Sequence, residues 1–304
     1  MADFKLLNYA GLAGEPRPGI LVGDDLVVDV QSASRGAPWS GSTLAIIGAW
    51  DVACPALHEI ADAAHDARPL ADVDLLAPIL YPPAIYCAGA NYKKHAMEMS
   101  PDGKTFPDKT KVKPYFFLKN PRHCVIGPGA DIRLPAVSKM VDWEAEFAVV
   151  ISKEGKNIAL DDAFDYVAGY TIMNDLSARD LGTRKDWPRF ATDWFSHKNF
   201  DGAAPMGPWI TPADQIGDPY QCRMKLFVND EEMQNEVVAD LIFDIADQIA
   251  SLSQNMTLLP GDVISTGTPS GVGRPRGIFL KPGDTVRITV DGIGELCNPV
   301  VQGD

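Results

Sequence analysis

The spacing of apolar and polar residues predicts short strands at the start of the chain and helices soon after it. Strand-like runs joined by a Gly-Asp-Asp turn predict a hairpin within residues 3–30. Apolar residues at helical spacing predict one or two helices over residues 43–66. The same spacing over residues 240–254 predicts a further helix, with Asp240 as its N-cap.

A proline-rich stretch at residues 75–83 predicts an extended connection between two parts of the chain. Beyond it the pattern favours strands, including two β-branched runs that each follow a Pro-Gly-Asp turn, at residues 263–266 and 285–290. We therefore expect two domains, a small N-terminal one over residues 1–75 and a larger, strand-rich one over residues 76–304.

Residues 141–151 alternate as a strand, so Glu144 and Glu146 face one side and Trp143 and Phe147 face a core on the other. The two carboxylates then lie roughly 7 Å apart by strand rise and repel each other. Either a cation neutralises them or the strand has a solvated edge, and this segment alone does not decide. Because carboxylates are hard oxygen ligands, the cation would be Mg²⁺, Mn²⁺ or Ca²⁺.

Two other segments carry candidate chemistry. Asp175 follows a predicted buried strand at residues 166–173 and offers a third carboxylate, although as an isolated residue it is more typical of an N-cap. A predicted helix beginning near Asn91 places His95 and Glu98 on one face, where the carboxylate can orient the imidazole for proton transfer. The alternative interpretation of this pair is an incidental surface contact.

Two basic residues follow these acids along the chain. Lys198 can offset the charge of a carboxylate cluster or polarise a substrate oxygen, and Arg179 can pair with a substrate carboxylate. Each is also consistent with a solvated surface cation. Serine, zinc and phosphate-loop chemistries are poorly supported, because their motifs do not occur in the sequence.

The net charge and the cysteine content of the chain limit what it can bind and where it is expected to act. The net charge of −14 argues against nucleic acid and anionic membrane surfaces, and leaves a small molecule as the expected partner. The five cysteines form no close pair, which fits reduced thiols. There is neither a signal-like start nor an apolar run of membrane-spanning length, so we expect a cytoplasmic protein.

Taken together, these residues resemble the fumarylacetoacetate hydrolase family, over about residues 82 to 301. The chain is more similar to bacterial acylpyruvase and 2-hydroxyhepta-2,4-diene-1,7-dioate isomerase members than to animal fumarylacetoacetase, since Gly89–Tyr92 supplies no fourth carboxylate before His95. The segments that carry the resemblance are Gly89–Glu98, Phe117–Pro121, Asp142–Glu146, Asn174–Asp180, His197–Asp201 and Thr266–Gly273.

The resemblance implies an α+β fold that is mainly β, with a mixed β-roll or distorted barrel as catalytic domain, in a homodimer. It implies one Mg²⁺ or Mn²⁺ per subunit, with Ca²⁺ as a substitute. The implied metal ligands are Glu144, Glu146 and Asp175; the catalytic residues are His95, Glu98 and Lys198, the first two on a lid; the substrate contacts are Tyr92, Lys119, Arg179 and Thr268.

On this basis we expect a metal-dependent hydrolase that cleaves a C–C bond of a 2,4-diketo acid, such as an acylpyruvate, fumarylpyruvate or a diketo-deoxy sugar acid. An isomerase of 2-hydroxydienoates or a decarboxylase of oxaloacetate-like acids on the same metal site is the alternative. A non-catalytic binding protein for a metal and a 2-oxo acid is a distant third. The aromatic and basic stretch 183–196 is either a substrate-selecting loop or a dimer contact.

Overall fold

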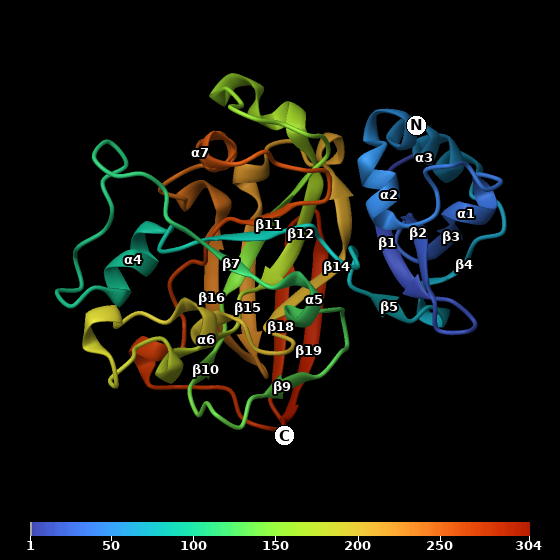
Figure 1. Ribbon diagram of the computed structural model, residues 1–304. Helices are drawn as coiled ribbons and strands as arrows, with labels where there is room; N and C mark the ends of the chain where they lie inside the picture. The colour runs from blue at the N-terminus through green and yellow to red at the C-terminus, as the bar shows by residue number, and fades with distance from the viewer. Residues whose placement is uncertain (1) are drawn as a thin grey trace.

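The structure is a computed structural model that describes residues 2–304. The chain begins with a small lobe, drawn in blue in Figure 1, in which helices cover an antiparallel sheet. Its strands are β1 (Phe4–Ala10), β2 (Pro16–Val22), β3 (Leu26–Asp29) and β4 (Arg68–Pro69). Its helices are α1 (Val30–Ala33), α2 (Thr43–Gly48) and α3 (Trp50–Ala63). The expected hairpin is thus confirmed, and the helical stretch expected over residues 43–66 forms two helices.

The small lobe is joined to the main body through its first strand. Leu6 of β1 pairs with Ile210 of β14, and β5 (Leu75–Leu76), in the predicted extended connection, pairs with β1. The central sheet of the body is therefore continuous with that of the lobe. Its strands are β6 (Ile85–Ala88), β7 (Phe116–Lys119), β8 (Val125–Ile126), β11 (Ala145–Ile151), β12 (Val167–Asn174), β14 (Ala204–Pro212) and β17 (Val263–Ser265).

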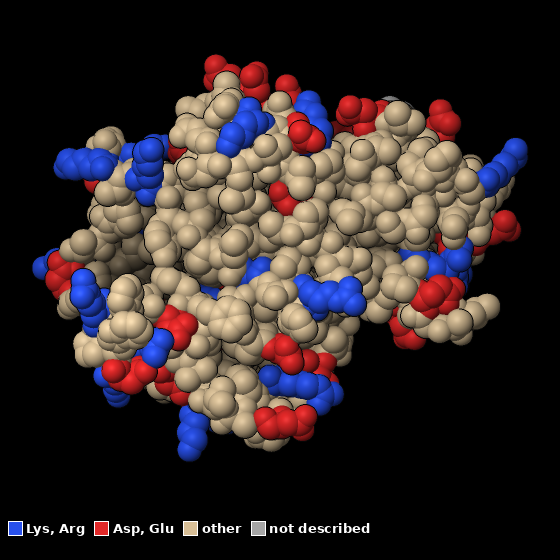
Figure 2. Space-filling view, viewed as in Figure 1, with Lys and Arg blue, Asp and Glu red and all other residues tan. Residues whose placement is uncertain are grey.

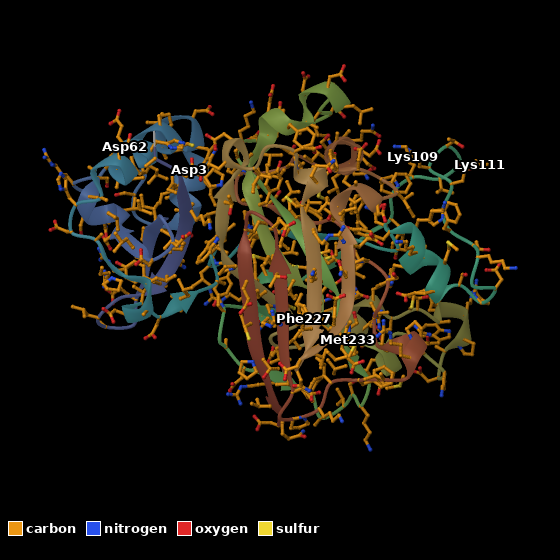
Figure 3. The ribbon with its side chains drawn as sticks, turned by 180° about the vertical axis from the view of Figure 1, so that it is seen from behind. Asp3, Asp62, Lys109, Lys111, Phe227 and Met233 are labelled. Atoms are coloured by element: carbon orange, nitrogen blue, oxygen red, sulfur yellow. The ribbon has the colours of Figure 1, made fainter. Side chains whose placement is uncertain are left out.

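A second sheet, with strand order β16-β15-β18-β19-β9, packs against the central one, and a two-stranded ladder joins β10 to β13. These strands are β9 (Ile132–Leu134), β10 (Val141–Asp142), β13 (Ser177–Ala178), β15 (Arg223–Val228), β16 (Glu231–Val237), β18 (Thr285–Val290) and β19 (Gly294–Gln302). Phe227 and Met233, labelled in Figure 3, lie on β15 and β16. The apolar core lies between the sheets.

The helices of the body are α4 (Lys93–Met99), α5 (Pro121–Cys124), α6 (Trp194–Lys198) and α7 (Ile245–Asn255). In Figure 1, two of them lie at the periphery of the body (α4 and α7), and two lie in front of the strands (α5 and α6). In the described part of the chain, no helix combines the length and the apolar character that crossing a membrane requires. The visible face in Figure 2 carries acidic and basic side chains intermixed.

The predicted α+β class, mainly β, is confirmed, and the larger sheet stays open between its edge strands β4 and β7. Two local predictions were wrong. The helix expected from Asp240 begins at Ile245, because Asp244 and Asp247 form a reciprocal capping box. The strand expected over residues 141–151 is interrupted at Trp143, whose buried indole Nε1 donates to the carbonyl of Gly271.

Candidate active site and metal centre

Three buried carboxylates meet at one end of the central sheet. Glu146 lies in β11, Glu144 immediately precedes that strand, and Asp175 immediately follows β12. The antiparallel pairing of β11 with β12 sets Ala145 opposite Asn174, and this register brings the three acids together. One oxygen from each lies within 4.8 Å of the other two. The structure thus favours a common site over the solvated edge that the sequence left open.

Buried cations surround these acids. Lys198 Nζ donates to Glu144 Oε2 and to Asp175 Oδ2, both at 2.7 Å. Arg179 donates from Nη2 to Glu144 Oε1 at 2.6 Å and from Nε to Asp142 Oδ2 at 2.8 Å. The predicted substrate contact Arg179 therefore already binds two carboxylates of the protein. Asp142 was not singled out in the sequence, where nothing indicated that the pairing of β10 with β13 would bring it to Arg179.

Lys119 lies behind the site rather than on its wall. Its Nζ donates to three carbonyl oxygens, those of Leu176, Lys198 and Ala203, at 2.7–2.9 Å. An ammonium group has three protons, so none remains for Asp175 Oδ1, although that oxygen is only 2.9 Å away. Asp175 Oδ1 is consequently a buried oxygen without a hydrogen-bond donor.

The charges within the cluster are unevenly compensated. Burial raises the pKa of Glu146 well above its usual value, and the neighbouring carboxylates of Asp175 and Glu144 raise it further. Burial acts in the same direction on Glu144, but Lys198 and Arg179 outweigh it and lower the pKa of that residue well below the usual range. Glu146 is therefore the carboxylate beside which an additional positive charge would be most stabilising.

A divalent cation fits this donor set. Three carboxylates supply hard oxygen ligands of the kind that Mg²⁺ and Mn²⁺ prefer, and one of those oxygens has no hydrogen-bond donor. Four buried acids face three buried cations, so one acid is left without a compensating positive charge. The four acids are Asp142, Glu144, Glu146 and Asp175, and the three cations are Lys119, Arg179 and Lys198.

The predicted pair on α4 forms next to this centre. His95 Nδ1 and Glu98 Oε1 are 2.8 Å apart, and both oxygens of Glu98 also accept the backbone N–H of Gly271, at 3.2 and 3.0 Å. The carboxylate therefore holds the proton on Nδ1 and leaves the lone pair on Nε2. His95 lines the same cavity as Glu144 and Glu146.

That cavity measures about 170 Å³. Two titratable residues on its wall were not selected as site residues from the sequence, His197 and Arg274. Burial, followed by the charges of Lys198 and Arg179, lowers the pKa of His197 to about 2, so its ring is neutral, and its Nε2 has no hydrogen-bond partner. Of His197 and Arg274, only His197 could have been found from the sequence, because it directly precedes the predicted catalytic residue Lys198.

The other predicted substrate contacts divide between the wall and the interior. Thr268 lines the cavity, where its hydroxyl donates to the carbonyl of Ala145 at 2.8 Å and accepts from Gln234. Tyr92 is 1% exposed and lies outside the cavity lining. From the stretch 183–196 only Trp194 reaches the wall, where it stacks on Phe117 with the ring centroids 4.8 Å apart.

The sequence of this chain is similar to those of several known proteins. Residues 84–301 match the family model described as fumarylacetoacetate (FAA) hydrolase C-terminal. The mitochondrial oxaloacetate tautomerase fahd2 of Xenopus laevis is 42% identical over 76% of this chain and 69% of its own length. Oxaloacetate tautomerase YisK of Bacillus subtilis is 36% identical over 93% of this chain and 95% of its own.

The fold of nearly the whole chain is also similar to that of a solved structure. Maleylpyruvate hydrolase from Sphingobium sp. SYK-6, in complex with manganese(II) ion and pyruvate, is 33% identical, with a TM-score of 0.77. The alignment covers 99% of this chain and 100% of that one. The relatives thus include both hydrolases and tautomerases. From the family match and the site geometry together, this chain is an enzyme of the fumarylacetoacetate hydrolase family.

Proposed function

We propose that the enzyme catalyses keto–enol tautomerisation of a small 2-oxo dicarboxylic acid of the oxaloacetate type. The observation that carries this proposal is the His95–Glu98 pair, which opens onto the cavity beside three carboxylates. Two relatives named as oxaloacetate tautomerases support the reaction class. This reaction is an isomerisation, like the alternative expected from the sequence, but its substrate is an oxaloacetate-type acid instead of a 2-hydroxydienoate. The expected C–C hydrolysis becomes the second candidate.

The size and charge of the cavity favour such a substrate. Its volume of about 170 Å³ is below the roughly 300–1,000 Å³ of pockets that hold drug-sized ligands, so an acid of a few carbons is the better match. Arg274 lies on the wall, and its side chain forms no ion pair with any of the described residues. Its guanidinium is therefore available for the distal carboxylate of the substrate.

The protein's own groups can move the proton. Because Nδ1 of His95 donates to Glu98, its Nε2 atom would be the one that takes a proton from the carbon next to the 2-oxo group. Glu98 stabilises the imidazolium that forms, because its carboxylate faces Nδ1. Return of that proton to the 2-oxo oxygen completes the conversion of ketone to enol, and the reverse sequence regenerates the ketone.

Lys198 supplies a fixed positive charge at the oxygen end of the reaction. Burial lowers its pKa, but Asp175 and Glu144 outweigh burial and raise the pKa above the usual value, so the ammonium stays protonated. Two of its three protons are donated to those carboxylates. The third remains for the substrate oxygen that gains negative charge.

Glu144, Glu146 and Asp175 would hold the divalent cation. When bound there, that cation supplies Lewis-acid stabilisation of negative charge on the 2-oxo oxygen and an anchor for the adjacent carboxylate. The protein residues do the remaining work: His95 transfers the proton, Glu98 orients His95, and Lys198 donates a hydrogen bond.

Hydrolysis of an acylpyruvate is the second candidate, favoured by one feature of the cavity. On the side of Gly89 and Met99 the cavity adjoins a further hollow of about 560 Å³, which gives room for an acyl group. The same dyad would then take a proton from water. The related maleylpyruvate hydrolase supports this class.

A product-resolved assay separates the two candidates. Purified protein with Mg²⁺ or Mn²⁺ is given enol oxaloacetate, and the loss of enol absorbance is followed alongside pyruvate and CO₂. A parallel assay with maleylpyruvate-type acylpyruvates detects two acids as products. We expect faster enol–ketone exchange without a change of mass. Failure to accelerate that exchange, with hydrolysis of an acylpyruvate instead, would overturn the first candidate.

Variants test the assigned roles in the same assay. His95→Ala should lower the rate by about 10²–10⁴-fold and keep the metal, whereas Glu144→Ala should lose metal and activity together. His123→Ala is the matched control, because the His123 side chain is 67% exposed on α5. A wild-type rate in His95→Ala would refute the dyad.

A further inference from the structure

A second cluster of ligand-type side chains lies between the two lobes, away from the active site. Cys54 and His58 are four residues apart on α3 and therefore face the same side of that helix. Asp214 approaches them from the main body, in the 3₁₀ turn Ala213–Gln215 that follows β14. One sulfur, one nitrogen and one oxygen atom of these residues lie within 4.8 Å of one another.

The hydrogen bonds of His58 determine which nitrogen faces this cluster. Nδ1 lies 2.8 Å from the backbone carbonyl of Ala2, which can only accept, so Nδ1 carries a proton and donates it. The other nitrogen, Nε2, lies 3.3 Å from Asp214 Oδ2. Either a proton on Nε2 or a cation bound to both atoms can bridge this separation, and the thiol of Cys54 completes the same cluster.

The surroundings of the ring hold it in this orientation. His58 is 6% exposed, and Phe4 packs edge-on against it with the ring centroids 4.9 Å apart. The first strand is in turn tied to the body, because the Phe4 amide donates to Gln215 Oε1 at 3.1 Å. A histidine that donates its other N–H to a backbone carbonyl has the arrangement typical of metal-ligating histidines.

We propose that Cys54, His58 and Asp214 form a binding site for a thiophilic divalent cation of the Zn²⁺ class, distinct from the hard-cation centre at Glu144. A thiolate, an imidazole and a carboxylate are all ligands of Zn²⁺, whereas Mg²⁺ and Mn²⁺ prefer oxygen alone. The Asp214 side chain is 58% exposed, so the fourth position is open to water. A cation bound there bridges the small lobe and the body.

The two centres are far enough apart to be studied separately. In Figure 1, α3 lies in the small lobe, and α4 and α6 lie on the opposite side of the body. Substitutions at Cys54 should leave catalysis unchanged.

The test is a titration of the full-length protein with Cd²⁺ in excess Mg²⁺, followed by the ultraviolet charge-transfer absorption of Cd–thiolate bonds. We expect a saturable band of one equivalent in the wild type, its loss in Cys54→Ser, and its retention in Cys297→Ser, a partly exposed cysteine on β19. Asp214→Asn should weaken binding at least about tenfold, the loss seen even when only a supporting group is removed.

Zn²⁺ provides a second readout that does not depend on absorption. It should raise the thermal unfolding temperature of the wild type and of Cys297→Ser, and leave that of Cys54→Ser unchanged. The proposal is overturned if the wild type shows no saturable band, if the band survives in Cys54→Ser, or if Asp214→Asn binds like the wild type. In those cases His58 and Asp214 form only an ion pair between the lobes.

Discussion

Glu98 Oε2 lies 3.0 Å from the backbone nitrogen of Gly271, which donates a hydrogen bond to it. Gly271 has a φ of +107°, and a Cβ there would come within 2.0 Å of the Met233 carbonyl oxygen. Only glycine fits this position without displacing the loop. The loop after β17 thus holds Glu98, and Glu98 holds the imidazole of His95.

Glu98→Gln should lower kcat by at least about tenfold and leave Mn²⁺ affinity unchanged. An amide can still accept the Gly271 N–H, but it no longer stabilises a positive imidazole with a full negative charge. Steady-state kinetics together with a Mn²⁺ titration would measure both effects. A loss of metal equal to the loss of rate would contradict the assignment of Glu98 to the base rather than to the metal.

Glu146→Gln should have effects of opposite sign with and without metal. In the metal-free protein the substitution removes a carboxylate that is buried beside two others, so the free energy of unfolding should rise by on the order of 1 kcal/mol. With Mn²⁺ present the variant should be less stable than the wild type, because a ligand is gone. Urea unfolding in both conditions measures this, and destabilisation without metal would contradict it.

Arg179→Met should destabilise the protein by about 3–5 kcal/mol, the cost of leaving a buried charge without its partner. Its guanidinium contacts two buried carboxylates, those of Asp142 and Glu144. Urea unfolding is the measurement, with Arg184→Met on the exposed loop as the control, since the ion pair of Arg184 with Asp186 is solvated. Equal stability of both variants would mean that Arg179 is free for substrate.

Arg274→Gln should raise KM for a 2-oxo dicarboxylic acid about tenfold or more while kcat changes little. The substitution removes a charge that would bind the distal carboxylate in both ground and transition states. A 2-oxo monocarboxylic acid of similar length is the control substrate, for which KM should not change. An equal effect on both substrates would place Arg274 outside the substrate contacts.

Because of the buried Asp262, we expect the free energy of unfolding to depend on pH. Burial raises the pKa of this carboxyl to about 6, above its unfolded value, so the native state binds the proton more tightly. The resulting stabilisation is fully present below about pH 4 and is lost as pH rises through 6. Asp262→Asn keeps the acceptor for the Leu259 N–H.

The variant should therefore match the wild type near pH 4 and exceed it by on the order of 1 kcal/mol above pH 7. Urea unfolding at the two pH values measures this difference. A difference that does not change with pH would show that Asp262 has an ordinary pKa in the native state.

Local sequence patterns were enough to identify the candidate metal ligands and the His95–Glu98 pair, but not the contacts that surround them. Glu144 and Glu146 could be found because strand alternation places them on one face, and His95 with Glu98 because helical spacing does the same. The interruption at Trp143 could not be predicted, because it depends on a hydrogen bond to Gly271, which is 128 residues away.

The same limit applies to the charges around the site. Asp142 and Arg179 are 37 residues apart and meet only through the β10–β13 ladder. Arg274 reaches the cavity because the backbone amides of Gly273 and Arg274 donate to the Asp142 carboxylate. Such contacts follow from the packing of distant segments, for which a single sequence has no local signal.

The three carbonyls bound by Lys119 have a consequence for folding. Their residues are 57, 79 and 84 positions away along the chain, so three loops must close before the ammonium group has its acceptors. Without them the buried ammonium group would lose all three of its hydrogen-bond acceptors, which is strongly unfavourable. The buried ammonium group therefore ties together three segments that are distant in the sequence, and a change at Lys119 should disturb all three at once.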